Sequence, residues 1–504
     1  MTALRLAGGA ATMPFLPRMV QRPVVWMVAA AVAAVLLVFA HHGYPTPNTD
    51  APSFLVGAVN FARGQGLVNP YYPHSAFGDL SGRDRLVYYP PAFPLAVSVL
   101  MPAPTSRGAF LAVAALRVLS IALAVVLLCR VAAAASTSPS RDQTALVALS
   151  LCGLATNWLP TQGRPEALAT LLVILAALAA LRLHGWALVA VFGILLGLTA
   201  ATQPMGAFEL GLVMCLWLAA REPPEVASPR VAVTAAIAVL VFTVFLALSP
   251  HGLRETLSGI LRSYPHTPWA SLPGSDWWKP WLTARRSTFY LPLFATAAGG
   301  AVWLVVRRPA HARSPYLLAA AAAGLLASFY HASFTHHALR NYNALLLSPI
   351  AFALLVAVAA RRPAARAVQA GALACVAASA VGFFGHLAFF PWYLRHGHTL
   401  EEGRARWTQA PVPRDVSVSM TGNLWALSEE YDRLRMTPIS GLDPRQLQPV
   451  LLLGQRREYE GEPPQLAGFR LVLDWFNREL ARPGPHRYFV PEDYSFAVYV
   501  KQAP

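Results

Sequence analysis

Long apolar runs recur along the first 390 residues of the chain and then stop. A helix that crosses a bilayer needs roughly 17–25 mainly apolar residues, and about eleven runs come near or reach that length. We therefore expect an all-α polytopic membrane domain over residues 1–390. The spans are predicted near residues 24–40, 109–133, 144–160, 166–183, 186–203, 207–220, 231–249, 289–306, 315–331, 343–360 and 367–390.

The polar gaps between these runs alternate in character. One set is short and rich in arginine, as at Arg130 with Arg141 or Arg307 with Arg308, and the positive-inside rule places such gaps in the cytoplasm. The other set is longer or aromatic, and we expect it to face outward. The N-terminus is then cytoplasmic and the C-terminus periplasmic. The outward set comprises residues 41–108, 161–165, 204–206, 250–288, 332–342 and the tail from 391.

The first outward loop, residues 41–108, contains two apolar segments that are too short to span. Residues Ala51–Ala62 predict an amphipathic helix directly after Asp50. Pro91–Pro104 is bracketed by prolines, and we expect an interfacial or re-entrant element there, which is tolerated where protein covers its backbone.

The tail, residues 391–504, is charged and interrupted by turn residues. Alternating apolar positions in Gln448–Leu453 and Ser495–Val500 predict strands, and Phe469–Leu480 is interpreted as an amphipathic helix. We therefore expect two domains, with a small outward α/β domain following the membrane domain.

Composition supports the membrane assignment. The chain of 504 residues is 56% hydrophobic and 13% charged, whereas soluble domains carry about 25% charged residues. Its net charge of +16 comes almost wholly from arginine, since lysine occurs only at Lys279 and Lys501. The arginines form short clusters between apolar runs rather than one basic face, so nucleic acid is not an expected partner.

Polar residues without an evident structural role gather in the outward gaps. Each has a simpler alternative: Asp50 could cap the helix that follows it, Arg164 and Glu166 could form a surface ion pair, and tyrosines are common at membrane interfaces. The histidines at 331, 336 and 337 lack the tight spacing of a zinc site, so no metal site is predicted. The candidate residues are Asp50, Arg83, Arg85, Tyr88, Tyr89, Arg164, Glu166, Gln203, His336, His337, Arg340 and Tyr342.

The order of these features resembles a known family. A first span is followed by an acidic residue and an amphipathic helix, then by the stretch YPPAFPL from Tyr89 to Leu95. A later span opens with RPEAL, from Arg164 to Leu168. This pattern is similar to the GT-C superfamily of integral-membrane glycosyltransferases, which includes lipid A aminoarabinose transferases and protein O-mannosyltransferases. It is most similar to bacterial members that modify lipopolysaccharide or other envelope glycans.

The resemblance implies an inverting transfer at the extracytoplasmic face of a bacterial inner membrane. The sugar would move from a polyprenyl-phosphate-linked donor to a hydroxyl of lipid A, a glycan or a protein. Asp50 matches the first-loop acidic residue of the family and is the implied general base, and Glu166 matches a second acidic position. No cofactor is expected to be required, and a divalent metal is left open.

The chemistry of glycosyl transfer suggests roles for the other candidates. A base must take the proton of the acceptor hydroxyl, and the transition state resembles an oxocarbenium ion. The leaving lipid phosphate needs guanidinium or imidazolium donors, which Arg83, Arg85, Arg164, His336, His337 and Arg340 offer. Tyr88, Tyr89, Gln203 and Tyr342 are candidates for sugar or acceptor contacts.

Two other functions are alternatives. A transporter or flippase of lipid-linked glycans would place ionisable groups near the membrane midplane. Arg117 and His386 are the only candidates at that depth, and they do not form such a pattern. A non-catalytic envelope assembly protein would use the outward loops to bind a partner.

Overall fold

A computed structural model of the chain describes most of the predicted elements. The described residues are 23–46, 51–69, 90–135, 141–159, 163–204, 206–207, 210–211, 213–215, 224–249, 252–263, 342–360, 366–436, 447–456, 459–490 and 492–502.

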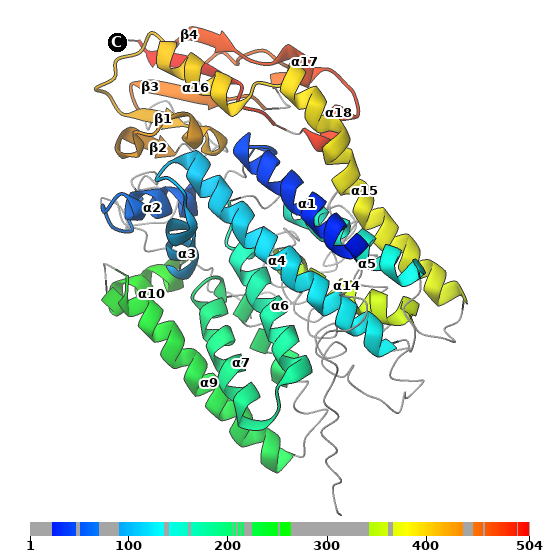
Figure 1. The fold of residues 1–504 in the computed structure, drawn as a ribbon. Helices are drawn as coiled ribbons and strands as arrows, with labels where there is room; N and C mark the ends of the chain where they lie inside the picture. The colour runs from blue at the N-terminus through cyan, green and yellow to red at the C-terminus, as the bar shows by residue number, and fades with distance from the viewer. Residues whose placement is uncertain are drawn as a thin grey trace, which may run out of the picture.

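Long helices form a bundle with a small sheet at one end, called the sheet end below (Figure 1). These helices stand where spans are predicted, except that 207–220 is described only in part and 289–306 and 315–331 lie outside the described residues. The bundle helices are α1 (Pro23–His41), α4 (Ser106–Ala135), α5 (Arg141–Trp158), α6 (Glu166–Arg182), α7 (Gly185–Ala200), α9 (Pro224–Ala247), α14 (Tyr342–Ala360) and α15 (Arg366–His396).

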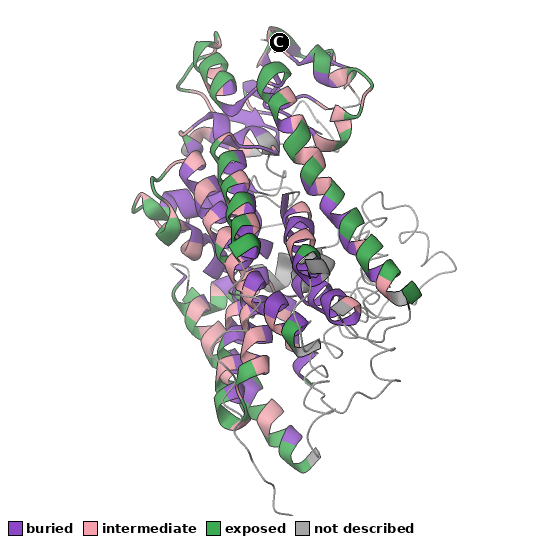
Figure 2. Cartoon of the chain, turned by 45° about the vertical axis from the view of Figure 1, so that its right-hand side comes forward, coloured by how far each residue is buried: buried purple, intermediate pink, exposed green. Residues whose placement is uncertain are grey.

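Four helices of the described chain are long and apolar enough to cross a membrane: Pro23–His41, Ser106–Ala133, Glu225–Ala247 and a stretch from Gln369. The protein is therefore a multi-pass membrane protein, and the number of eleven spans is not confirmed. The outer faces of α9 and α15 are apolar and exposed, with Leu240 at 64% and Val381 at 59% (Figure 2). Such faces would be unusual in water and suit contact with lipid tails.

Two short helices lie side by side between the sheet and the bundle. They are α2 (Pro52–Ala62) and α3 (Ala92–Leu100), and they confirm the helices predicted in the first loop (Figure 1). The amphipathic character predicted for α2 is wrong, because every residue from Pro52 to Asn60 is buried. The helix packs against α3 and α4 and beneath the C-terminal domain, so it has no free polar face. A further helix, α10 (Gly252–Ser263), follows α9.

The C-terminal domain contains a five-stranded sheet with the order β2-β1-β3-β5-β4. Strands β2 (Leu434–Met436), β1 (Val418–Met420) and β3 (Val450–Gly454) are parallel. Strand β5 (Phe496–Lys501) is antiparallel to β3 and β4. The predicted strands at 448–453 and 495–500 thus correspond to β3 and β5.

The helix predicted at Phe469–Leu480 is wrong. Phe469–Trp475 forms β4 at the edge of the sheet, and only Arg478–Ala481 is helical, as α17. The register against β5 shifts between Leu471 and Leu473. This bulge breaks the alternation of period two, so the apolar positions imitate a helical spacing.

The remaining helices connect the domain to the bundle. Helix α15 continues past the boundary predicted at residue 390 and ends at His396, and α16 (Leu400–Gln409) and α18 (His486–Phe489) lie close to its end. Helix α18 contacts α15 through the stacked rings of Phe389 and Phe489, whose centroids are 5.2 Å apart. The division into residues 1–390 and 391–504 stays a prediction.

Candidate functional site

The structure describes part of the predicted site. The described candidates are Arg164, Glu166 and Gln203, together with the backbone of Tyr342, which begins α14. The others lie outside the described residues, and their roles stay predictions. These are Asp50, Arg83, Arg85, Tyr88, Tyr89, His336, His337 and Arg340.

Arg164, Glu166 and Gln203 form one hydrogen-bonded cluster. The Arg164 Nε donates to Glu166 Oε2 at 3.2 Å, and a terminal guanidinium nitrogen of Arg164 donates to Oε1 at 3.4 Å. The Gln203 Nε2 donates to the same Oε1 at 3.2 Å. Arg164 is 7% exposed and Glu166 is 1% exposed. The alternative of a surface ion pair is therefore wrong, because this pair is buried.

Local sequence explains the turn that carries the cluster. Gly163 has φ = +84°, a left-handed conformation that only glycine adopts without strain. Pro165 follows with φ = −61° and precedes α6, whose first residue is Glu166. A carboxylate in the first turn of a helix interacts favourably with the helix dipole. The Gly-Arg-Pro-Glu order therefore fixes both the turn and the position of the charge.

Two residues of the first loop contact residues that neighbour this cluster. A Cβ added to Gly163 would stand 2.6 Å from the Cβ of Ala51, so this turn packs directly on the residue that follows Asp50. The backbone N–H of Ala92, three residues after Tyr89, donates to the carbonyl of Ala201 at 3.0 Å. The described part of the first loop therefore lies next to the turn before α6 and to the end of α7. The N-cap of α2 is Ala51, and Asp50 lies outside the described residues.

Arg117 also belongs to the site, although the sequence did not predict this. It lies on α4, is 4% exposed, and is attracted electrostatically by Glu166. Its guanidinium carbon lies 5.8 Å from the centre of the Trp158 ring, a distance at which a cation is attracted to an aromatic face. An arginine within a long apolar run was the available signal. The sequence could not show that Glu166 lies near it.

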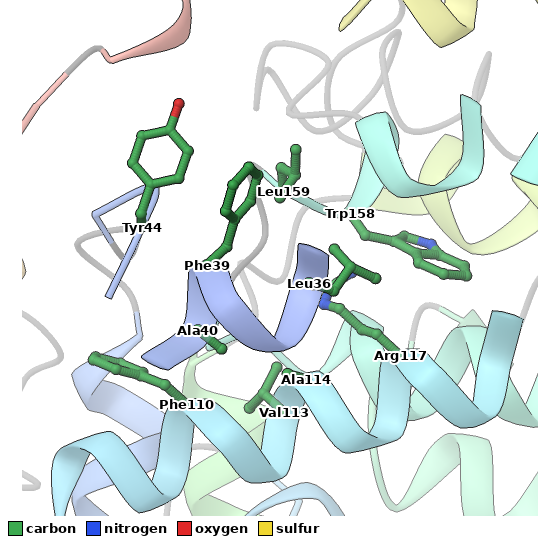
Figure 3. Close-up of a pocket in the computed structure, with 10 residues that line it drawn as sticks. All are labelled: Leu36, Phe39, Ala40, Tyr44, Phe110, Val113, Ala114, Arg117, Trp158 and Leu159. Atoms are coloured by element: carbon green, nitrogen blue, oxygen red, sulfur yellow. The ribbon is translucent and has the colours of Figure 1, made fainter. Parts of the chain in front are cut away.

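A small cavity of about 20 Å³, partly open to solvent and with room for about one water molecule, lies beside Arg117. Its walls come from the sheet-end part of α1, from α4 and from the end of α5. In Figure 3 the Arg117 side chain extends from α4 toward the turn of α1 that bears Leu36, with Trp158 nearby. The other lining residues are Phe39, Ala40, Tyr44, Phe110, Val113, Ala114 and Leu159. The lining is therefore mainly apolar, with Arg117 as its charged residue.

The described charged groups of this region are Arg117, Arg164 and Glu166. Guanidinium groups suit an anionic ligand such as a phosphate. Across the described ranges, no three His, Cys, Asp or Glu side chains come together as metal ligands. Asp50, His336 and His337 lie outside those ranges, so metal dependence stays open.

No family model and no curated protein matches the chain. Solved structures of the oligosaccharyltransferase AglB from the archaeon Archaeoglobus fulgidus do match. The apo form is 12% identical, with a TM-score of 0.45 over 87% of this chain and 70% of that chain. A complex of AglB with an inhibitory peptide and a dolichol-phosphate is 11% identical, with the same TM-score and coverage. AglB is a GT-C enzyme, as the sequence resemblance suggested. At this degree of similarity, the matches transfer no residue role, substrate or mechanism to this chain.

Proposed function

We propose that the protein is a GT-C-type glycosyltransferase that moves a sugar from a polyprenyl-phosphate-linked donor to a hydroxyl of an envelope acceptor. The observation that supports this most is the packing of Ala51 and Ala92, from the first loop, on Gly163 and Ala201, which neighbour the buried cluster of Arg164, Glu166 and Gln203. The sequence resemblance also points to Arg164 and Glu166. The reaction would take place at the extracytoplasmic face of a bacterial inner membrane.

In the proposed reaction, the acceptor hydroxyl attacks the anomeric carbon on the face opposite the phosphate. A new carbon–oxygen bond forms while the bond from that carbon to the phosphate oxygen breaks, and the configuration inverts. Asp50 takes the proton of the hydroxyl as a general base. The phosphate leaves with the electron pair of the broken bond, and fixed cations such as Arg164 stabilise its growing charge.

Glu166 has a different role from Asp50 in this proposal. Both of its oxygens already accept hydrogen bonds from Arg164 or Gln203. We therefore assign Glu166 to holding Arg164 in place rather than to proton transfer. The same contact orients Gln203, because the Gln203 Nε2 donates to Glu166. The Oε1 of Gln203 is buried and accepts no hydrogen bond from the described residues. This oxygen is therefore available to a sugar hydroxyl.

Arg117 suits the phosphate of the donor, because a guanidinium attracts a phosphate. Arg117 is 4% exposed, so a charge interaction there is screened less than one in water.

The test measures transfer of radiolabelled sugar from polyprenyl-phosphate donors by purified protein in nanodiscs. Wild type is compared with Asp50→Asn and with the matched control Asp415→Asn, a carboxylate on an exposed segment of the C-terminal domain. Loss of a general base typically costs about 10²–10⁴-fold in rate. We expect that loss for Asp50→Asn alone.

Equal rates for the two variants would refute Asp50 as the base. The wild-type protein is also assayed with a panel of sugar donors and of lipid, glycan and protein acceptors. No transfer to any of them would refute the proposal that the protein is a glycosyltransferase. Movement of a lipid-linked glycan between leaflets, measured in the same vesicles, would then identify a flippase.

A further inference from the structure

The C-terminal domain binds the chain directly after α1. Residues Gly43–Thr46 run past the segment Phe489–Tyr494, and three side-chain hydroxyls join the two stretches. Tyr494 Oη donates to the Gly43 carbonyl (3.1 Å), Tyr44 Oη to the Phe489 carbonyl (3.0 Å) and Thr46 Oγ1 to the Glu492 carbonyl (2.8 Å).

This contact is closely packed. Gly43 has φ = +63°, and a Cβ there would lie 2.3 Å from Tyr494 Oη, so only glycine fits. Tyr44 is 1% exposed, and its hydroxyl also lies 3.1 Å from His386 Nδ1 on α15. Buried hydroxyls that lose their partner leave an unsatisfied group, which costs about 1–3 kcal/mol each. The contact is therefore specific rather than incidental.

The receiving segment is itself fixed by Asp493, which is 2% exposed. Its Oδ2 accepts from the His398 backbone N–H at 2.9 Å and from Asn477 Nδ2 at 2.8 Å. Its Oδ1 accepts from the Ser495 backbone N–H at 3.0 Å. One carboxylate thus ties the segment both to the connection after α15 and to the start of α17.

A second attachment holds the other end of α2. Arg63 follows α2 and donates from one terminal nitrogen to the Glu429 carboxylate at 3.1 Å and from the other to its carbonyl at 2.9 Å. Its Nε donates to the Pro104 carbonyl at 3.0 Å. The same carboxylate accepts from Arg404 (2.5 Å), Tyr431 Oη (2.7 Å) and Ser106 Oγ (3.1 Å).

We infer that the C-terminal domain positions α2 relative to α1, with Tyr494 and Glu429 as positioning residues for the site. Tyr494 holds the chain directly after α1 at Gly43, and Glu429 holds it directly after α2 at Arg63. Helix α2 is held at Arg63 and against Gly163, so it acts as a fixed support. The positioning role rests on the proposed function.

The test uses the full chain in nanodiscs and three variants. Tyr494→Phe and Thr46→Val each remove one hydroxyl of the contact and keep the shape of the side chain. The control is Tyr499→Phe in the same domain: Tyr499 is 2% exposed, and its hydroxyl donates to the Pro464 carbonyl at 2.7 Å. It does not touch residues 43–46. Amide hydrogen exchange over residues 42–46 is measured together with kcat and KM for transfer.

We expect exchange over residues 42–46 to accelerate at least about fivefold in both test variants and not in the control. A displacement of about 1 Å at a reacting group can cost about 10²-fold, so kcat should fall at least about tenfold with donor KM within twofold. Retention of wild-type exchange by both variants would overturn the inference. Faster exchange with unchanged kcat would overturn the positioning role. Faster exchange in a protein that shows no transfer activity would support the attachment of residues 43–46 to the C-terminal domain. The same result would refute the proposed function and therefore the positioning role.

Discussion

The buried pair of Arg164 and Glu166 allows a quantitative prediction. Its nitrogen and oxygen are 3.2 Å apart, and the side chains are 9% and 1% exposed. At an effective dielectric constant of about 20, unit charges at this distance attract by about 5 kcal/mol. Removing one partner leaves the other charge buried and alone, which costs about 3–5 kcal/mol. We therefore expect Glu166→Gln and Arg164→Gln each to destabilise the protein by about that amount.

An exposed pair offers a control at nearly the same separation. Arg478 and Asp474 are 3.1 Å apart, with side chains 67% and 29% exposed. Exposed pairs typically contribute about 0.2–1 kcal/mol. The comparison therefore changes burial while it keeps distance and charge.

The assay is a double-mutant cycle for each pair, with unfolding free energies from SDS titration in mixed micelles followed by tryptophan fluorescence. The buried pair should show a coupling energy of about 1–3 kcal/mol, because the double variant leaves no lone buried charge. A coupling no larger than that of the exposed pair would refute the reasoning. Each variant is also assayed for transfer, which tests whether Glu166 acts through Arg164.

Two further predictions concern the turn and the domain contact. Thermal unfolding should show that Gly163→Ala destabilises the protein by more than Gly252→Ala does. Both glycines have positive φ, so an alanine at either position is strained by about 1–3 kcal/mol. Only the alanine at position 163 would also clash with Ala51. Equal losses would mean that the close approach does not matter. Burial raises the pKa of the Tyr494 and Tyr431 hydroxyls above the usual value of about 10, so their hydrogen bonds stabilise the fold below about pH 10 and lose this contribution as pH rises further. The protection factor for exchange over residues 42–46, which removes the intrinsic base catalysis of exchange, should therefore fall above about pH 10; a constant protection factor from pH 8 to 11 would contradict this.

Much of the bundle could be predicted from local pattern. A span is defined by a window of apolar residues whose length the bilayer sets, so α1, α4, α9 and α15 were visible without knowledge of their neighbours. The helix at α2 was predictable for the same reason, but its burial was not. Burial of α2 depends on α3, α4 and the C-terminal domain, which are distant in sequence.

The sequence predicted which gaps between spans contribute residues to the site, but not how those side chains are arranged. The alternation of arginine-rich and aromatic gaps predicted that residues 161–165 and 204–206 share a face. Arg164 in the first gap and Gln203, directly before the second, do meet at Glu166. The sequence left a surface ion pair open as an alternative. It identified Arg117 as a charge at membrane depth but could not assign it a partner, because hydropathy does not describe contacts across a helix interface.

Edge strand β4 shows the same limit within the C-terminal domain. Its bulge at Leu471 and Leu473 makes local periodicity ambiguous, and pairing with β5 resolves it.

The sequence alone determined where the chain enters an apolar phase, where it turns, and which short motifs lie near the ends of spans. These properties are sums over neighbouring residues. Only the tertiary structure decided that Gly163 packs on Ala51, that Glu166 acts electrostatically on Arg117 and that Tyr494 holds Gly43. Each of these interactions joins residues tens to hundreds of positions apart, and its free energy depends on close packing and burial that no local window contains.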